Sequence, residues 1–304
     1  MFLVTGGAGF IGSHLVGRLI ERGESVCVFD DFSTGTIDNL DTVRDRIDLI
    51  AGDVRDEGSV RRAVDGACVI FHQAAISSVQ RAIEDSRTTL EVNVVGTLNV
   101  LVAAREAGCR RVVFASSAAV YGDAPGLPRS ETMTPRPLST YAVSKLAGEH
   151  LCSVFARTSG LETVALRYFN VFGPRQAPGS PYSGVIARFL DALRMGAPPI
   201  VYGDGEQSRD FVAVDDVVEA NLRAASAPAV AGRVFNIGSG QAVTVNALLA
   251  TMAEVMGVEI AAVHKPSRPG EIRYSLADIT AARQALGFEV SVPLEIGLAQ
   301  TMTN

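Results

Sequence analysis

A glycine-rich turn stands near the start of the chain, between a short apolar run and a predicted helix. The run Phe2–Thr5 has the apolar and β-branched character of a buried strand, and residues 6–12 read GGAGFIG. Gly6 allows a tight turn, Gly9 lets the backbone approach a ligand, and Gly12 permits close packing of helix on strand. The amino end of that helix attracts negative charge. This arrangement predicts a site for the pyrophosphate of a dinucleotide.

An acidic residue ends the next predicted strand. Asp30 lies 18 residues beyond Gly12, where a carboxylate can accept hydrogen bonds from both ribose hydroxyls and would repel a 2′-phosphate. The pattern therefore favours NAD over NADP. Two later strands are followed by Gly52-Asp53-Val54 and by Gln73-Ala74-Ala75. Asp53 fits an acceptor for the adenine amino group and an ordinary turn residue equally well, whereas the small alanines leave room for a cofactor.

Short β-branched runs alternate with helical stretches in the first half of the chain. The predicted strands are Phe2–Thr5, Ser25–Phe29, Asp48–Ala51, Cys68–Phe71, Arg111–Ala115 and Thr163–Arg167. The predicted helices are His14–Arg22, Ser59–Val64, Leu90–Ala107 and Tyr141–Thr158. This alternation predicts an α/β fold with a doubly wound parallel sheet. Beyond Phe172, Gly-Pro-rich loops lead into a smaller α+β lobe, so we expect domains at 1–173 and 174–304, whose segments are free to interleave.

The composition narrows the class of protein. With 47% apolar and 20% charged residues the chain can bury a core, and its formal charge of −6 argues against a nucleic-acid partner or an anionic membrane surface. No stretch is apolar enough for a bilayer span, and no signal peptide precedes the glycine turn. Cysteines 27, 68, 109 and 152 lie in or beside apolar runs, which predicts buried free thiols in the cytoplasm. The four histidines have no metal-ligand spacing.

The helix predicted over Leu90–Ala107 is apolar almost all round. It carries valine or leucine at positions 92, 94, 95, 98, 100, 101 and 102, more than one buried face of a helix uses. A second partner for this helix, such as another subunit, is therefore expected.

A tyrosine and a lysine stand four residues apart, on one face of the helix predicted over Tyr141–Thr158. A free tyrosine is a poor base at neutral pH, but the charges of Lys145 and of a bound nicotinamide ring both favour the phenolate of Tyr141 and so lower its pKa. Only two of the 27 basic residues are lysines, Lys145 and Lys265. The pair Ser116-Ser117 follows a predicted strand at the sheet edge where α/β proteins bind ligands.

Six segments together resemble the extended short-chain dehydrogenase/reductase family: Thr5–Gly12, Asp30, Ser116–Gly122, Tyr141–Lys145, Leu166–Gly173 and Arg268–Glu271. Within that family the chain is similar to the nucleotide-sugar 4-epimerases of the UDP-glucose/UDP-N-acetylglucosamine type, over essentially its whole length. The resemblance implies a Rossmann domain holding NAD and a C-terminal lobe for the UDP-sugar. It also implies a homodimer formed through the helices that match Leu90–Ala107 and Tyr141–Thr158.

The resemblance also implies roles for individual residues. Tyr141 is the base, Lys145 holds the nicotinamide ribose, and Ser117 hydrogen-bonds the sugar O4. The expected substrate-binding residues are Ser117, Tyr141, Asn170, Arg209, Arg268, Glu271 and Ser275. On sequence alone each arginine fits a surface ion pair better. The expected cofactor-binding residues are Gly6, Gly9, Phe10, Ile11, Gly12, Asp30, Asp31, Asp53, Val54, Gln73, Ala74, Ala75, Asn93, Tyr141, Lys145 and Tyr168.

The implied reaction is redox-neutral epimerisation through a 4-keto sugar. Related dehydratases need an Asp-Glu pair after the active-site Ser or Thr, and decarboxylases a glutamate in the same stretch, but this chain has Ala118 and Ala119 there. A net dehydrogenase or reductase is the alternative, and a non-catalytic member is disfavoured because Tyr141 and Lys145 are both present. Ser275 falls at the position that admits or refuses N-acetyl sugars, so we expect both kinds of substrate to be accepted. A shift of one residue would put the bulky Tyr274 there instead and reverse this expectation.

Overall fold

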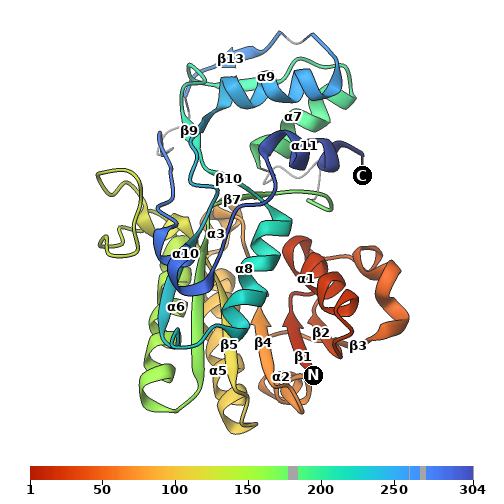
Figure 1. The fold of residues 1–304 in the computed structure, drawn as a ribbon, viewed down its shortest axis with the longest axis vertical. Helices are drawn as coiled ribbons and strands as arrows, with labels where there is room; N and C mark the ends of the chain where they lie inside the picture. Colours follow the sequence, from red (N-terminus) through yellow and green to blue (C-terminus); the bar gives the residue numbers. More distant parts are fainter. Residues whose placement is uncertain (177–183, 260, 268–271, 304) are drawn as a thin grey trace.

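Seven parallel strands form the main sheet of the protein, shown in Figure 1 as a computed structural model that describes residues 1–176, 184–259, 261–267 and 272–303. The strand order is β11-β6-β5-β4-β1-β2-β3. The strands are β1 (Phe2–Thr5), β2 (Val26–Asp30), β3 (Ile47–Ala51), β4 (Val69–His72), β5 (Arg111–Ser117), β6 (Glu162–Tyr168) and β11 (Arg233–Ile237). The α/β doubly wound fold is confirmed, and all six predicted strands lie in this sheet.

Helices cover both faces of the sheet because neighbouring strand residues point to opposite sides. Leu3 packs into one core and Val4 into the other. One core takes side chains from α1 (Phe10–Glu21) and α8 (Val214–Ser226). The other takes them from α2 (Glu57–Val64), α5 (Gly96–Glu106) and α6 (Thr140–Thr158). Two 3-10 helices, η1 (Ile37–Arg46) and η3 (Ala118–Tyr121), follow β2 and β5.

A smaller group of elements lies beyond the carboxyl ends of the main strands, at the top of Figure 1. Its strands pair two by two: β7 (Asn170–Phe172) with β10 (Phe211–Ala213), β9 (Ser208–Arg209) with β12 (Val243–Thr244), and β8 (Ile200–Tyr202) with β13 (Val263–Lys265). Its helices are α7 (Val185–Arg194), α9 (Val245–Met256) and α11 (Leu294–Thr303), and α10 (Thr280–Leu286) lies lower, beside β11. This region has its own apolar core around Phe172, Phe189 and Leu248.

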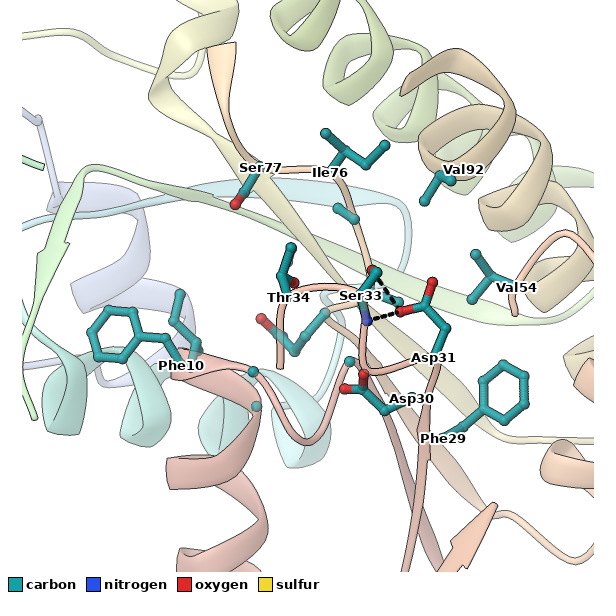
Figure 2. Close-up of a pocket in the computed structure, with 18 of the residues that line it drawn as sticks. Phe10, Phe29, Asp30, Asp31, Ser33, Thr34, Val54, Ile76, Ser77 and Val92 are labelled. Carbon is teal, nitrogen blue, oxygen red and sulfur yellow. Dashed lines mark hydrogen bonds between the residues drawn. The ribbon is translucent and has the colours of Figure 1, made fainter. Parts of the chain in front are cut away.

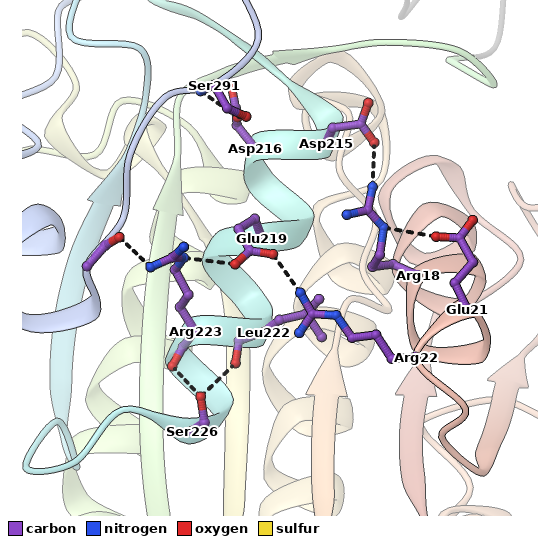
Figure 3. Close-up of polar contacts among 11 residues, drawn as sticks. Arg18, Glu21, Arg22, Asp215, Asp216, Glu219, Leu222, Arg223, Ser226 and Ser291 are labelled. Atoms are coloured by element: carbon purple, nitrogen blue, oxygen red, sulfur yellow. Dashed lines mark hydrogen bonds and ion pairs between the residues drawn. The ribbon is translucent and has the colours of Figure 1, made fainter.

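The sequence analysis did not predict strand β11, which comes from the second half of the chain and yet belongs to the main sheet. It pairs with β6 at the end of the main sheet. The segment 214–237 therefore returns to the main sheet after the chain has passed through the smaller group of elements. Figure 3 shows how the preceding helix α8 is tied to α1: Asp215 faces Arg18 at 3.7 Å, and Glu219 accepts from Arg22 at 2.8 Å. The helix that follows the glycine turn is thereby held against the returning segment.

Two local predictions need correction. Cys27, Cys109 and Cys152 are buried as expected, but Cys68 is exposed because it lies just before β4, at the amino end of this central strand. The helix predicted over Leu90–Ala107 starts earlier and is not uniform: α3 (Val79–Glu84) and α4 (Ser86–Leu90) precede a π-helical turn, η2 (Glu91–Val95), which leads into α5. Among the described residues, no helix has the length and apolar character needed to cross a bilayer.

Candidate functional site

A cavity of about 280 Å³ opens at the carboxyl ends of β1, β2, β4 and β5 (Figure 2). This edge is where doubly wound sheets bind ligands. Fourteen of the sixteen residues expected to bind a cofactor line it, namely Gly6, Gly9, Phe10, Ile11, Gly12, Asp30, Asp31, Val54, Gln73, Ala74, Ala75, Tyr141, Lys145 and Tyr168. The structure therefore brings together, in one cavity, residues that are up to 162 positions apart in the sequence.

The glycine turn leaves no room for side chains. A Cβ on Gly12 would lie 2.1 Å from the Gly6 carbonyl oxygen, and one on Gly6 would lie 2.6 Å from the Ala74 nitrogen. Gly6 also has a φ of +67°, in the region that glycine adopts freely. The turn thus presents bare backbone to the cavity at the start of α1, as a pyrophosphate site requires. These residues fit the phosphates of a dinucleotide.

Replacing Gly12 by alanine is expected to weaken dinucleotide binding, because the new methyl group must displace the backbone of the turn. Overpacking of this kind costs about 1–3 kcal/mol, which corresponds to a loss of roughly tenfold to a hundredfold in affinity. Titration of NAD binding by fluorescence measures the effect. Gly17→Ala is the matched control on the same helix, since a Cβ there meets nothing within 4 Å. Equal affinities of the two variants would contradict this view of the turn.

The acidic residues after β2 and β3 differ in what they can offer a ligand. Asp30 is buried, and its carboxylate accepts from the backbone N–H of Ala8 at 2.9 Å and of Phe32 at 2.8 Å. Burial raises the pKa of Asp30 and these hydrogen bonds oppose the rise. Each oxygen keeps a free lone pair for a ribose hydroxyl. Asp31 accepts from Ser33, as Figure 2 shows.

Asp53 does not line the cavity. Its carboxylate binds the guanidinium of Arg55, with Arg55 Nε 2.9 Å from Oδ2, and Arg55 rather than Asp53 lines the cavity wall. Of the two possibilities that the sequence left open for Asp53, this position resembles the ordinary turn residue. Asn93, the other expected cofactor residue outside the lining, is buried on η2 and binds the backbone of Ile76 through both ends of its amide.

Gln73 and Tyr168 are held together at the base of the cavity. The Tyr168 hydroxyl lies 3.1 Å from Gln73 Nε2 and 2.8 Å from Nδ2 of Asn221, a residue of α8. Burial raises the pKa of Tyr168 to about 12. A phenol with so high a pKa stays neutral at neutral pH, and Tyr168 forms part of the cavity wall.

Tyr141 and Lys145 face the cavity from the first turns of α6, and both are buried. Lys145 Nζ donates to the Ala115 carbonyl at 2.8 Å and lies 5.9 Å from the centre of the Tyr141 ring. Ser117 does not line the cavity, but its hydroxyl is hydrogen-bonded to Tyr141. The three expected catalytic residues are thus neighbours at the end of β5.

The electrostatics of the protein alone differ from the expectation. Burial raises the pKa of Tyr141, with the Ser117 hydrogen bond opposing, and burial lowers the pKa of Lys145 to about 8. The expected lowering of the Tyr141 pKa by Lys145 is not found: burial and the Ser117 hydrogen bond are the causes of the shift. A Lys145 pKa of about 8 leaves this group mostly charged at neutral pH. The positive charge of a bound nicotinamide ring would favour the phenolate of Tyr141.

Twelve further residues line the cavity, and of these the sequence analysis singled out only Ser116 and Gly52, at the ends of predicted strands. The twelve lie on β2 and β5, in loops, on η2 and on helices α3 and α4: Phe29, Ser33, Thr34, Gly52, Arg55, Ile76, Ser77, Arg81, Thr88, Val92, Ala115 and Ser116. Arg81 adds a half-buried guanidinium to the wall. For Ile76 and Ser77, their position directly after Ala74-Ala75 was a usable signal.

Two expected substrate residues line a second, smaller cavity of about 120 Å³. Asn170 of β7 and Arg209 of β9 meet there with Arg188 of α7 and Tyr202 of β8. The second cavity thus belongs to the smaller group of elements and holds two guanidinium groups, which suit a diphosphate. Arg188 was not foreseen.

The segment 272–276 runs beside β9. The Ser275 N–H donates to the Ser208 carbonyl at 3.1 Å, and Ser275 is half-buried. Tyr274 is 45% exposed and its hydroxyl accepts from Arg273 Nε at 2.8 Å. Arg268 and Glu271 lie outside the described residues. Among the residues that the structure describes, no cluster of His, Cys, Asp or Glu could hold a metal ion.

Comparison with known proteins matches this geometry. The model of the NAD dependent epimerase/dehydratase family matches residues 2–238. The UDP-glucose 4-epimerase of Mycolicibacterium smegmatis is 40% identical over 99% of this chain and 96% of its own length.

Two solved structures are also similar. The UDP-N-acetylglucosamine 4-epimerase from Methanobrevibacter ruminantium has a TM-score of 0.95 at 36% identity, covering 99% of this chain and 96% of its own. The Thermus thermophilus UDP-glucose 4-epimerase complex with NAD has a TM-score of 0.90 at 38% identity, covering 99% and 97%. The glycine turn, the Tyr141–Lys145 pair and these full-length similarities lead to one conclusion: the chain belongs to the NAD dependent epimerase/dehydratase family.

Proposed function

We propose that this protein is an NAD-dependent UDP-hexose 4-epimerase that interconverts UDP-glucose and UDP-galactose, and UDP-GlcNAc and UDP-GalNAc. The observation that carries the proposal is the placement of Tyr141, Lys145 and Ser117 on the same cavity edge as the bare glycine turn and Asp30. Relatives of the same length, with the same fold, are epimerases of this kind. The alternative, a net dehydrogenase or reductase, is not favoured.

The cofactor would be held by the glycine turn at its pyrophosphate and by Asp30 at a ribose. NAD, when bound, would supply the acceptor and donor of the C4 hydride. Tyr141 then takes the proton from the sugar O4 and returns it, while Ser117 donates a hydrogen bond to that oxygen. Lys145 supplies a fixed positive charge beside the nicotinamide ribose.

Epimerisation requires the 4-keto sugar to present its other face to the same hydride site. The sugar can turn only if its nucleotide end stays bound meanwhile, and the second cavity provides that grip through Arg188 and Arg209. We infer that the diphosphate lies there, near Asn170. Arg268 and Glu271 complete the expected grip on the diphosphate and the uridine ribose.

The width of the sugar site decides whether an N-acetyl group fits. Tyr274 is exposed and bound to Arg273, whereas the small Ser275 is the half-buried member of the pair. This supports acceptance of both plain and N-acetylated UDP-hexoses.

Proton NMR of the purified protein with UDP-glucose, and separately with UDP-GlcNAc, tests the function without added NAD. The proposal expects a new 4-epimer in each sample, approaching equilibrium. NADH accumulation upon addition of NAD⁺, with no epimer, would identify a dehydrogenase instead.

We also propose a homodimer formed through α5 and α6. Leu90, Val95 and Leu98 lie before or within α5 and are 38–47% exposed, while Val143 and Val154 of α6 are 46% and 45% exposed. Such side chains are expected to be covered by an equivalent pair of helices. Leu98→Lys should therefore shift the mass found by light scattering from two chains to one, and a wild-type monomer would contradict the proposal.

The remaining proposals concern organisation and location. Residues 1–173, joined by α8 and β11, form the NAD-binding part, and most of 174–304 forms the nucleotide-sugar part. The four cysteines are free, which supports a reducing, cytoplasmic location.

A further inference from the structure

His72 lies at the end of β4, 1% exposed, between two threonine hydroxyls. Its Nδ1 is 2.7 Å from Thr5 Oγ1, and its Nε2 is 3.0 Å from Thr97 Oγ1. Thr5 ends β1 beside the glycine turn, and Thr97 belongs to α5. The imidazole therefore connects the strand end beside the glycine turn to helix α5.

The neighbours of His72 determine which nitrogen carries the proton. The Thr97 hydroxyl donates to the Asn93 carbonyl at 2.6 Å, so its oxygen is left to accept from His72 Nε2–H. A neutral imidazole has one N–H, so Nδ1 must accept from the Thr5 hydroxyl. The Thr5 oxygen in turn accepts from the Ala74 N–H at 3.3 Å. These hydrogen bonds form one chain in which every group donates in the same direction, from the Ala74 N–H toward the Asn93 carbonyl.

Both ends of this hydrogen-bond chain lead to the functional site. At one end, Ala74 lines the cofactor cavity. The other end is the backbone carbonyl of Asn93, and the side chain of the same residue begins a second chain: it donates to Ser144 Oγ at 2.9 Å, and Ser144 donates to the Tyr141 carbonyl at 2.7 Å. The same Asn93 amide holds both backbone groups of Ile76, a further cavity residue. The cavity wall and the first turn of α6 are thus joined through buried side chains.

The surroundings keep His72 neutral. Its ring centre lies 5.8 Å from that of Phe114, and Lys145 Nζ lies 5.2 Å from the same Phe114 ring. Burial, and to a lesser degree the charge of Lys145, lowers the pKa of His72 to about 3. A proton on both nitrogens would also leave the Thr5 hydroxyl without its acceptor. A neutral imidazole is the only form that satisfies both threonines.

We propose that His72 is a positioning residue: as the Nε2–H tautomer it directs a hydrogen-bond chain from the Ala74 N–H to the backbone carbonyl of Asn93, and so fixes the residue whose side chain is bonded through Ser144 to the backbone of Tyr141. The proposal rests on the proposed function in so far as it takes Tyr141 to be the base. These hydrogen bonds fix the start of α6 relative to the wall of the cofactor cavity, and so they set the position of the Tyr141 phenol relative to the sugar. A shift of that kind lowers kcat more than it changes substrate binding.

The matched pair Thr97→Val and Thr163→Val separates positioning from stability. Both threonines are buried, at 1% and 0% exposure, and each hydroxyl donates to a helix carbonyl, that of Thr163 to Cys152 at 2.8 Å. Thr163 accepts nothing from His72 and lies away from the chain. Both variants should lose similar thermal stability. Only Thr97→Val is expected to lower kcat, by about tenfold, with the KM for UDP-glucose unchanged within about twofold.

Nitrogen-15 NMR of the histidine rings reads the tautomer directly, after assignment by replacing His14, His150 and His264 one at a time. The wild type is expected to show His72 protonated on Nε2. Thr97→Val removes the acceptor of that proton, so the ring should change to the Nδ1–H form, which can donate to the Thr5 oxygen. Thr5→Val and Thr163→Val should keep the Nε2–H form.

An Nδ1–H ring in the wild type would overturn the proposal, and so would equal kcat values for Thr97→Val and Thr163→Val. The tautomer is measured without any substrate. A protein that shows the expected tautomers but no epimerase activity would therefore refute the proposed function and leave the hydrogen-bond chain standing.

Discussion

Tyr141→Phe is expected to lower kcat for UDP-hexose epimerisation by about 10²–10⁴-fold, the usual contribution of a positioned acid–base group. The substitution removes only the phenolic oxygen, which is hydrogen-bonded to Ser117 at the end of β5. Because the ring stays in place, the cavity wall and the KM for the UDP-sugar should change little. Initial rates measured with saturating UDP-galactose give the comparison.

Tyr121→Phe is the matched control for this loss. Tyr121 is also buried, and its hydroxyl donates to Asn236 at 2.7 Å, but it does not line the cofactor cavity. Its variant should retain kcat within a few fold while losing about 1 kcal/mol of stability, as is typical for one hydrogen bond. If Tyr141→Phe kept wild-type turnover, another group would have to be the base.

Glu149→Gln is expected to destabilise the fold by about 3–5 kcal/mol, because it leaves a buried guanidinium without a counter-charge. Glu149 of α6 and Arg167 of β6 are 4% and 5% exposed and form a two-bond pair, at 2.8 and 2.7 Å. The other face of the guanidinium lies over the Tyr121 ring, 4.7 Å from its centre, and an aromatic face cannot replace a carboxylate. Urea unfolding measures the change.

The double variant Glu149→Leu with Arg167→Met tests the cause of this loss. Removing both charges together should recover most of the stability, since apolar replacement of a buried pair is often close to neutral. Glu57→Gln serves as the exposed comparison: its partner Arg61 is 56% exposed, and the loss should stay below about 1 kcal/mol. A Glu149→Gln midpoint equal to that of Glu57→Gln would show that the buried charge needs no partner.

The parts of the site that local sequence predicts are those built by one turn or one helix. The glycine turn, Asp30 and the Tyr141–Lys145 pair each depend on spacings of a few residues around a strand end, and the cavity contains all of them. The resemblance to a known family added Arg209 and Asn170, which meet in the second cavity.

What the sequence did not reveal depends on contacts between distant segments. Strand β11 joins the sheet only because β6 offers a free edge some 70 residues earlier in the chain. Asn93 does not line the cavity. Its side chain extends from the π-helical turn to the backbone of Ile76, a residue of the cavity wall, and binds the N–H and the C=O of that residue. Asp53 binds Arg55 beside it, a pairing that spacing alone did not reveal.

The most direct test of the central claim follows one atom. UDP-galactose carrying deuterium at C4 is incubated with the purified protein, without added NAD, and the product is examined by NMR and mass spectrometry. Redox-neutral epimerisation predicts UDP-glucose that retains the deuterium at C4, since the hydride leaves and returns within one bound complex. A reaction that needs added NAD⁺, releases deuterated NADH and yields only the keto sugar would contradict the account.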